Sequence, residues 1–339
     1  MYHHDINEPR RMTSYHLRQQ GQQLLRVETL NDLSHLLKTP VKHLKKVAEN
    51  PRYDQFFIPK SSGGKRMIQN PNHYLKKMQK RLSYLFQGIY HPIKPDCAYG
   101  FIQSVEDEHP ARNIYTNAER HIGKKWVLNI DMKDFFHTVS GEHVKRIFRR
   151  PPFRFTRKAS HYLSLLVTHE GRLPMGAPTS PVLSNMACLD LDKKLSELSE
   201  ENEWVYTRFA DDMTFSSEYP ITHIHIENIT KRIEQQGFSI NPKKIRLYRE
   251  GDKAEVTGLV LGERHPDVSG TFVENIQRDI QLFHLVTDDR TLQRDFFDSR
   301  SVVKLERSIQ GQINFVKFVR GEADSTHIHL RRMLDPHFR

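Results

Sequence analysis

Two adjacent carboxylates, Asp211 and Asp212, lie within a run of apolar and β-branched residues at 206–215. Such a run predicts a β-hairpin with the acids at its tip. A second apolar run, at 126–131, ends in Asp131. Two strands that bring three carboxylates together make a site for hard divalent cations, and two such cations about 4 Å apart are a common arrangement for in-line phosphoryl transfer. If these acids bind no metal, Asp211 and Asp212 would form a solvated turn, and Asp131 would cap a helix at the end of its strand.

The charge balance points to a polyanionic partner. Lysine and arginine number 52 against 41 acids, which gives a net charge of +11. Between Lys38 and Arg81 the only acids are Glu49 and Asp54, and the basic residues there surround the glycine-rich turn at 61–65. A charge run can be a solvated face, but a turn of this kind favours a phosphate-facing surface.

The chain has few cysteines and no long apolar stretch. Its two cysteines, Cys97 and Cys188, do not form a Cys-x-x-Cys pattern, which fits a reducing compartment. No eighteen-residue apolar run and no signal-peptide pattern is present. We therefore expect a cytoplasmic protein with no membrane partner.

The order of periodic segments predicts an α+β fold. The first fifty residues and the region after 265 have helical patterns, and Val302, Leu305, Ile309, Ile313 and Val316 have helical spacing. A glycine- and proline-rich loop covers 171–180. The remaining predicted elements are hairpins at 54–70 and 204–216, a strand within 123–136, helices at 74–89, 143–149, 158–168, 182–198 and 222–236, and two short strands at 245–262.

Several motifs together resemble the successive motifs of a reverse transcriptase. They occur in that family's order, and they are Lys60 with Lys65-Arg66, Asp131 with Phe135-Phe136, the segment Leu173 to Pro181, Phe209-Ala-Asp-Asp212, and the segment Gly237 to Lys244. Two further signatures, Asn117-Ala-Glu-Arg-His121 and Val256-Thr257-Gly258, resemble those of retron reverse transcriptases. The chain is therefore identified as a suspected retron-type member of the family.

This resemblance implies a right-hand polymerase fold. It assigns 1–50 to an N-terminal helical extension, 51–122 to the fingers, 123–262 to the palm with part of the fingers, and 263–339 to a helical, RNA-binding thumb. In the thumb, the basic residues are Lys304, Arg307, Lys317, Arg320, Arg331 and Arg332.

The resemblance also implies a metal site for two Mg²⁺ ions. Asp131 and Asp211 would bridge both ions, and Asp212 would support them. The backbone carbonyl of Met132 would complete the coordination of the ion that carries the triphosphate. All three acids are expected to be catalytic.

For the incoming nucleotide, the resemblance implies contacts from three basic residues and from an aromatic pair. Lys60, Lys65 and Arg66 would reach the triphosphate, because arginine binds phosphate through two parallel hydrogen bonds; a basic solvated turn is the alternative. Phe136 would pack beneath the sugar and exclude a 2′-hydroxyl, or else be a core aromatic. Phe135 is expected to be buried.

The remaining nucleotide-site residues come from two loops. Gly176 would let backbone approach the nucleotide closely, and Met175 stands where relatives commonly have glutamine. Phe209 similarly replaces a common tyrosine. Both departures bear on nucleotide affinity and fidelity. Lys244 either stabilises the palm near the nucleotide or is a surface lysine.

Five residues belong to the retron-specific signatures. Asn117 and His121 are four apart, so a helix would place them on one face. They either contact RNA or brace the palm by hydrogen bonds. For Val256, Thr257 and Gly258 the same two roles, RNA contact or a brace of the palm, stay open.

The resemblance implies an RNA-directed DNA polymerase that makes single-stranded msDNA. A structured noncoding RNA would be its template, and a 2′-hydroxyl of that RNA its primer. Its partners would be this msr-msd RNA, the msDNA product, dNTPs, and an effector or toxin protein of an anti-phage defence system. The rivals are another prokaryotic reverse transcriptase, of group II intron or abortive-infection type, and a non-catalytic RNA-binding relative.

Overall fold

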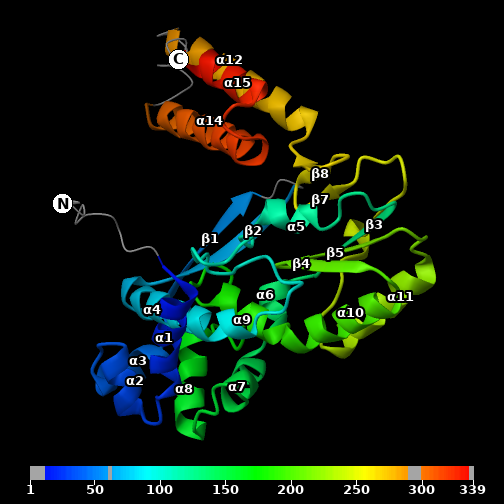
Figure 1. Ribbon diagram of the computed structural model, residues 1–339. Helices are drawn as coiled ribbons and strands as arrows, with labels where there is room; N and C mark the ends of the chain where they lie inside the picture. Colours follow the sequence, from blue (N-terminus) through cyan, green and yellow to red (C-terminus); the bar gives the residue numbers. More distant parts are fainter. Residues whose placement is uncertain (1–11, 60–62, 289–298, 336–339) are drawn as a thin grey trace, which may run out of the picture. The chain divides into compact units, whose positions relative to one another are not determined.

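The computed structural model describes residues 12–59, 63–288 and 299–335 (Figure 1). The chain divides into two compact units, one comprising residues 1–117 and 124–250 and the other residues 118–123 and 251–339. Both units contain helices and antiparallel strands, which confirms the predicted α+β class. The division into extension, fingers, palm and thumb stays a prediction.

A four-stranded antiparallel sheet forms the centre of the first unit (Figure 1). The strand order is β4 (Val205–Phe209), β5 (Asp212–Ser217), β3 (Trp126–Asp131) and β6 (Arg246–Tyr248). The interior strand β5 is buried along all but its first residue, in keeping with its apolar and β-branched sequence. The predicted strand before Asp131 and the predicted hairpin at 204–216 are both confirmed.

Helices pack around this sheet and beside one another. Several of them begin at a polar residue that accepts a backbone N–H, as Thr29, Asn72 and Thr156 do. Their buried faces meet in an aromatic core in which the rings of Phe86 and Phe148 stack at 5.4 Å. Between residues 14 and 235 the helices are α1 (Ser14–Leu25), α2 (Leu30–Leu36), α3 (Val41–Glu49), α4 (His73–Tyr90), α5 (Ile114–Glu119), α6 (Phe135–Thr138), α7 (Gly141–Arg149), α8 (Arg157–Val167), α9 (Ser180–Ala187), α10 (Leu189–Glu201) and α11 (His223–Gln235).

A separate two-stranded hairpin carries the basic turn. It pairs β1 (Tyr53–Pro59) with β2 (Lys65–Pro71), which confirms the predicted hairpin at 54–70. Its tip, 60–62, includes Lys60 and lies outside the described residues. The base of β2 is tied to the glycine- and proline-rich loop, because the Gln69 N–H donates to the Met175 carbonyl at 2.7 Å.

In its described residues, 118–123, 251–288 and 299–335, the second unit joins a small sheet to the helices α12 (Gly270–Asp288), α14 (Ser299–Arg320) and α15 (Ser325–Leu334). The sheet contains β7 (Glu255–Val256), β8 (Leu259–Leu261) and β9 (Pro266–Asp267). The helical region predicted after 265 is thus confirmed. The prediction of two strands at 245–262 is wrong, because β6, β7 and β8 all lie there and β6 pairs with β3.

Two of the predicted RNA-binding cations are engaged within the second unit. Arg320 donates to both carboxylate oxygens of Asp267, at 2.6 and 2.9 Å, and Lys317 is 2.5 Å from Glu322. In the ranges 12–59, 63–288 and 299–335, no helix has the length and apolar character that a membrane crossing requires.

Candidate active site

The three predicted catalytic carboxylates lie at one end of the central sheet. Asp131 ends β3 and stands opposite Asp212, the first residue of β5, in the antiparallel register. Asp211 belongs to the two-residue loop between β4 and β5, and its carbonyl accepts the Met132 N–H at 3.0 Å. Acids from distant parts of the sequence therefore share one small region.

The loop that carries Asp211 has a strained backbone held by two neighbours. Ala210 has a φ of 59°, and a non-glycine residue in this left-handed region costs about 1–3 kcal/mol. The Arg208 Nη1 donates to the Ala210 carbonyl at 2.9 Å. On the other side, a Cβ added to Gly100 would lie 2.5 Å from the Ala210 nitrogen, so only glycine lets the backbone come so close. These contacts fix the direction in which the acids point.

Arg208 is itself fully buried in a polar network beneath the loop. It donates to the two carboxylate oxygens of Asp192 at 2.7 and 2.6 Å and to Asn185 Oδ1 at 3.0 Å. The Tyr206 hydroxyl also donates to Asp192, at 3.1 Å. Burial alone would lower the pKa of Arg208, but the Asp192 carboxylate raises it well above its usual value, so the guanidinium stays charged. A buried charge with all its partners in place is rigid.

Sequence reasoning missed Arg208, Asp192 and Asn185. The available signal was an arginine inside an otherwise apolar strand, which is a residue that needs a partner when the strand is buried.

Negative charge accumulates where the acids meet. Desolvation, followed by repulsion from Asp211 and Asp131, raises the pKa of Asp212 to about 6. Desolvation and the Asp131 carboxylate also raise the pKa of Asp211. The Lys244 ammonium offsets part of this charge, because it lies 2.7 Å from Asp131 Oδ2. The positive charges of Lys244 and Arg66 thus offset only part of the repulsion among the carboxylates.

The donor set suits a hard divalent cation, which prefers carboxylate and carbonyl oxygens. In the part of the chain that the structure describes, no three histidine, cysteine, aspartate or glutamate side chains are already arranged to hold a metal ion. The Lys244 ammonium donates a hydrogen bond to one oxygen of the Asp131 carboxylate, Oδ2. The chemistry of the residues therefore fits a metal, which Asp131, Asp211 and Asp212 would hold through their carboxylate oxygens.

The predicted nucleotide contacts of the hairpin and the loop lie on connected segments. Lys65 and Arg66 begin β2 and are exposed, and the positive charge of Arg66 opposes a part of the rise that desolvation causes in the pKa of Asp211. Gly176 has a φ of 118°, and a Cβ there would lie 2.8 Å from Ile68 Cγ2. The glycine is needed for close packing of the loop on β2.

The two predicted aromatic residues differ in burial. Phe135 is 3 % exposed and packs in the core, whereas Phe136 is half-buried. The ring of Phe136 lies 5.8 Å from that of Phe101, centroid to centroid. The half-buried ring of Phe136 leaves a surface on which a sugar could rest.

The retron-specific residues are buried or lie in turns. Asn117 is in α5 and His121 follows its end, so the prediction that one helix face carries both is wrong. Both side chains are buried. Val256 is buried in β7, and Thr257 and Gly258, with φ of 50° and 82°, form the tight turn to β8. The glycine of this signature has a backbone role.

One protein-family model matches most of the region described above. Its description is "Reverse transcriptase (RNA-dependent DNA polymerase)", and it matches residues 58–261. This range includes the three acids, the basic hairpin from Ile58 onward and the glycine-rich loop.

Curated relatives carry the same type of name. The chain is 34 % identical over 245 residues to the retron Mx162 reverse transcriptase of Myxococcus xanthus, which covers 63 % of this chain and 48 % of the relative. It is 32 % identical to the retron Mx65 reverse transcriptase of that organism, with coverage of 62 % and 51 %. For the retron Ec86 reverse transcriptase of Escherichia coli the identity is 28 %, with coverage of 74 % and 76 %. The chain thus spans about half the length of the first two relatives.

Proposed function

Because the chain belongs to the reverse transcriptase family, we propose that it is an RNA-directed DNA polymerase that extends DNA on an RNA template. The observation that carries this proposal is the pairing of Asp131 with Asp212 across β3 and β5, with Asp211 in the adjoining loop. The acids come from separate motifs of the matched region. An intact acidic site argues for a working enzyme and against a scaffold that only binds RNA.

We propose Mg²⁺ as the cofactor. Asp131, Asp211 and the Met132 carbonyl would hold it, and Asp212 would support them. When bound, two such ions stabilise charge on the attacking and leaving oxygens of an in-line displacement. Lys244, 2.7 Å from Asp131 Oδ2, offsets part of the negative charge of the acids.

The nucleotide is positioned by residues on three segments. Lys65 and Arg66, with Lys60, would bind the triphosphate of a dNTP through charge-assisted hydrogen bonds. Phe136 would lie beneath the sugar, where a 2′-hydroxyl would clash with the ring. Gly176 allows the backbone of its loop to approach the base pair, and the thioether of Met175 can only fill space beside it.

We further propose that the enzyme is of retron type. It would use a structured noncoding RNA as template and as 2′-hydroxyl primer, make msDNA in the cytoplasm, and act with an effector in anti-phage defence. The retron relatives support this. Residues 263–339 would form the RNA-binding thumb, and Asn117, His121 and the turn 256–258 would serve RNA recognition or brace the palm.

The reaction is tested by replacing the two adjacent acids. The Asp211→Asn/Asp212→Asn protein should lose cDNA synthesis on an RNA–DNA primer pair and keep its affinity for RNA. Wild-type cDNA yield from this variant would refute the site. Equal loss of RNA binding would mean that the substitutions damage the fold.

The retron type is tested separately in expressing cells. Extracted nucleic acid should contain a short single-stranded DNA whose mobility changes after RNase or debranching treatment. A protein that extends generic primer pairs but yields no such DNA is another kind of prokaryotic reverse transcriptase.

A further inference from the structure

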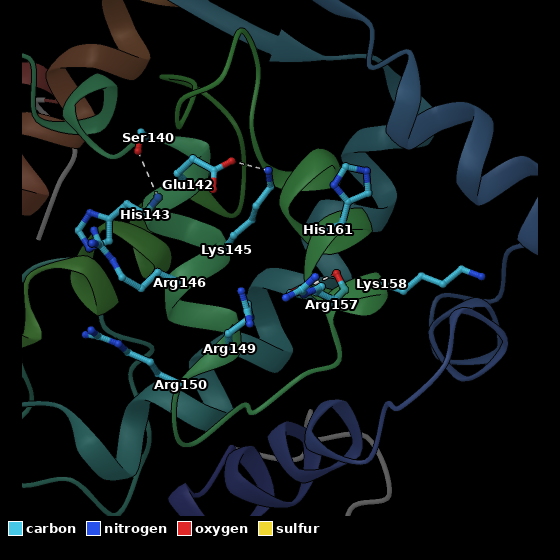
Figure 2. A pocket seen from close by; sticks show the side chains of 11 residues that line it. Ser140, Glu142, His143, Lys145, Arg146, Arg149, Arg150, Arg157, Lys158 and His161 are labelled. Atoms are coloured by element: carbon cyan, nitrogen blue, oxygen red, sulfur yellow. Dashed lines mark hydrogen bonds and ion pairs between the residues drawn. The ribbon is translucent and has the colours of Figure 1, made fainter.

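A basic cavity of about 980 Å³ lies between α7 and α8, and none of the predicted site residues lines it (Figure 2). Its lining has two histidines, His143 and His161, and one acid, Glu142. The permanent cations of the lining are Lys145, Arg146, Arg149, Arg150, Arg157 and Lys158. Figure 2 shows Arg149 of α7 and Arg157 of α8 bordering the space between the two helices.

The local sequence explains why the cations gather there. On α7, Val144 and Phe148 are buried in the core, so the basic residues between and after them face outward. On α8, the first two residues, Arg157 and Lys158, are exposed, and burial begins at Ala159. The apolar pattern that anchors the two helices therefore directs their basic residues outward, where they line one hollow.

Little negative charge within the protein balances this cluster. Glu142 is paired with Lys145 at 2.5 Å. Arg150 lies 3.8 Å from Asp190, but both side chains are largely exposed, and such a pair contributes little. Burial and the charge of Arg146 lower the pKa of His143, in keeping with a positive potential. Like charges at helical spacing destabilise a fold, and an anionic ligand removes that cost.

We propose that this cavity binds the phosphodiester backbone of the RNA that the enzyme carries, at a place separate from the acidic site. Arginine matches phosphate oxygens through two parallel hydrogen bonds. No phenylalanine, tyrosine or tryptophan lines the cavity, and its six permanent cations outnumber its two histidine rings, so contacts with the phosphate backbone outweigh stacking on bases. Cations spread over two helices suit several consecutive phosphates better than a single one. The choice of RNA as occupant rests on the proposed function.

The test reverses one charge on each helix. Arg149→Glu/Arg157→Glu removes two exposed cations, and the effects on helix stability oppose each other, since an acid is unfavourable in the last turn of α7 and favourable in the first turn of α8. The control, Lys193→Glu/Lys231→Glu, makes the same change in charge at exposed positions of α10 and α11 outside the cavity. Should the first variant fold poorly, Arg149→Gln/Arg157→Gln gives a milder version.

The readout is the affinity for a fluorescent RNA hairpin across about 50 to 200 mM salt. The cavity variant should bind about tenfold or more weakly than wild type, with a salt slope smaller by about two, and the control should bind as wild type does. A DNA hairpin of the same sequence and inorganic triphosphate are measured in parallel.

Equal weakening for both hairpins supports recognition of the backbone. Unchanged RNA affinity, weakening of the DNA hairpin alone, or an effect confined to triphosphate overturns the proposal. Extension of a short RNA–DNA primer pair at saturating concentration should persist in the cavity variant. Failure of the polymerase proposal is recognised independently, because it concerns extension by wild type and by the Asp211→Asn/Asp212→Asn protein.

Discussion

Replacing Gly100 by alanine should displace the loop that carries the acids. The added Cβ would lie 2.5 Å from the Ala210 nitrogen, whereas ordinary contact begins at 3.4 Å, so one backbone segment must move by about 0.9 Å. The nearest atoms all belong to the backbone of Phe209 and Ala210, and none is the end of a flexible side chain. Overpacking of this kind costs about 1–3 kcal/mol, and a misplacement of about 1 Å at a reacting centre can lower a rate about a hundredfold.

The assay combines thermal unfolding with single-nucleotide extension at saturating dNTP. Gly100→Ala should lower Tm by roughly 1–6 °C and kcat by about two orders of magnitude, with RNA affinity preserved. Gly141→Ala is the matched control, because its Cβ would meet its nearest neighbour at 3.5 Å. It should behave as wild type. Wild-type rate and Tm for Gly100→Ala would show that Gly100 does not hold the loop.

Three further substitutions test the charges around the fold. Asp192→Asn leaves the Arg208 guanidinium buried without its counter-charge and should cost about 3–5 kcal/mol in denaturant unfolding; a cost below about 1 kcal/mol would contradict the network. Asp212→Asn should stabilise the protein in EDTA at pH 7 by about 1 kcal/mol, after discounting for exposure. The raised pKa of Asp212, about 6, means that only the ionised carboxylate destabilises the folded protein. The stability gained by Asp212→Asn should therefore vanish as the pH falls from 6 toward 3.8, where wild-type Asp212 becomes protonated. Burial alone would raise the pKa of Glu108, but Lys94 lowers it, so Glu108→Gln should reduce Tm at pH 7 and match wild type well below pH 4.5.

Much of the central sheet could be predicted from the sequence, because alternating and β-branched residues have a local signature. The acids of the site were found for the same reason, since charged residues at the ends of apolar runs stand out. The recognition of a reverse transcriptase fold is confirmed by the family match over residues 58–261, and the curated relatives that the chain resembles are retron reverse transcriptases.

What escaped prediction depends on contacts between distant residues. Arg208 has the same local appearance as a surface arginine, and only the fold reveals that Asp192 and Asn185 surround it. The helix expected to carry Asn117 and His121 ends at Glu119, although the residues between them are good helix formers. Strand β6 is only three residues long, which is too short for a periodic pattern, so its pairing with β3 has no local signal.

The hydrogen bond from Gln69 to Met175 couples the basic hairpin to the glycine- and proline-rich loop, so that a shift of one segment also moves the other. With the nucleotide contacts proposed above, a force applied to the basic hairpin by a triphosphate would be transmitted at the base of the hairpin to the loop that contains Met175. Conversely, a mismatched pair that pushes this loop outward also disturbs the grip on the triphosphate. Selection of the correct nucleotide would then depend at the same time on its triphosphate and on its base.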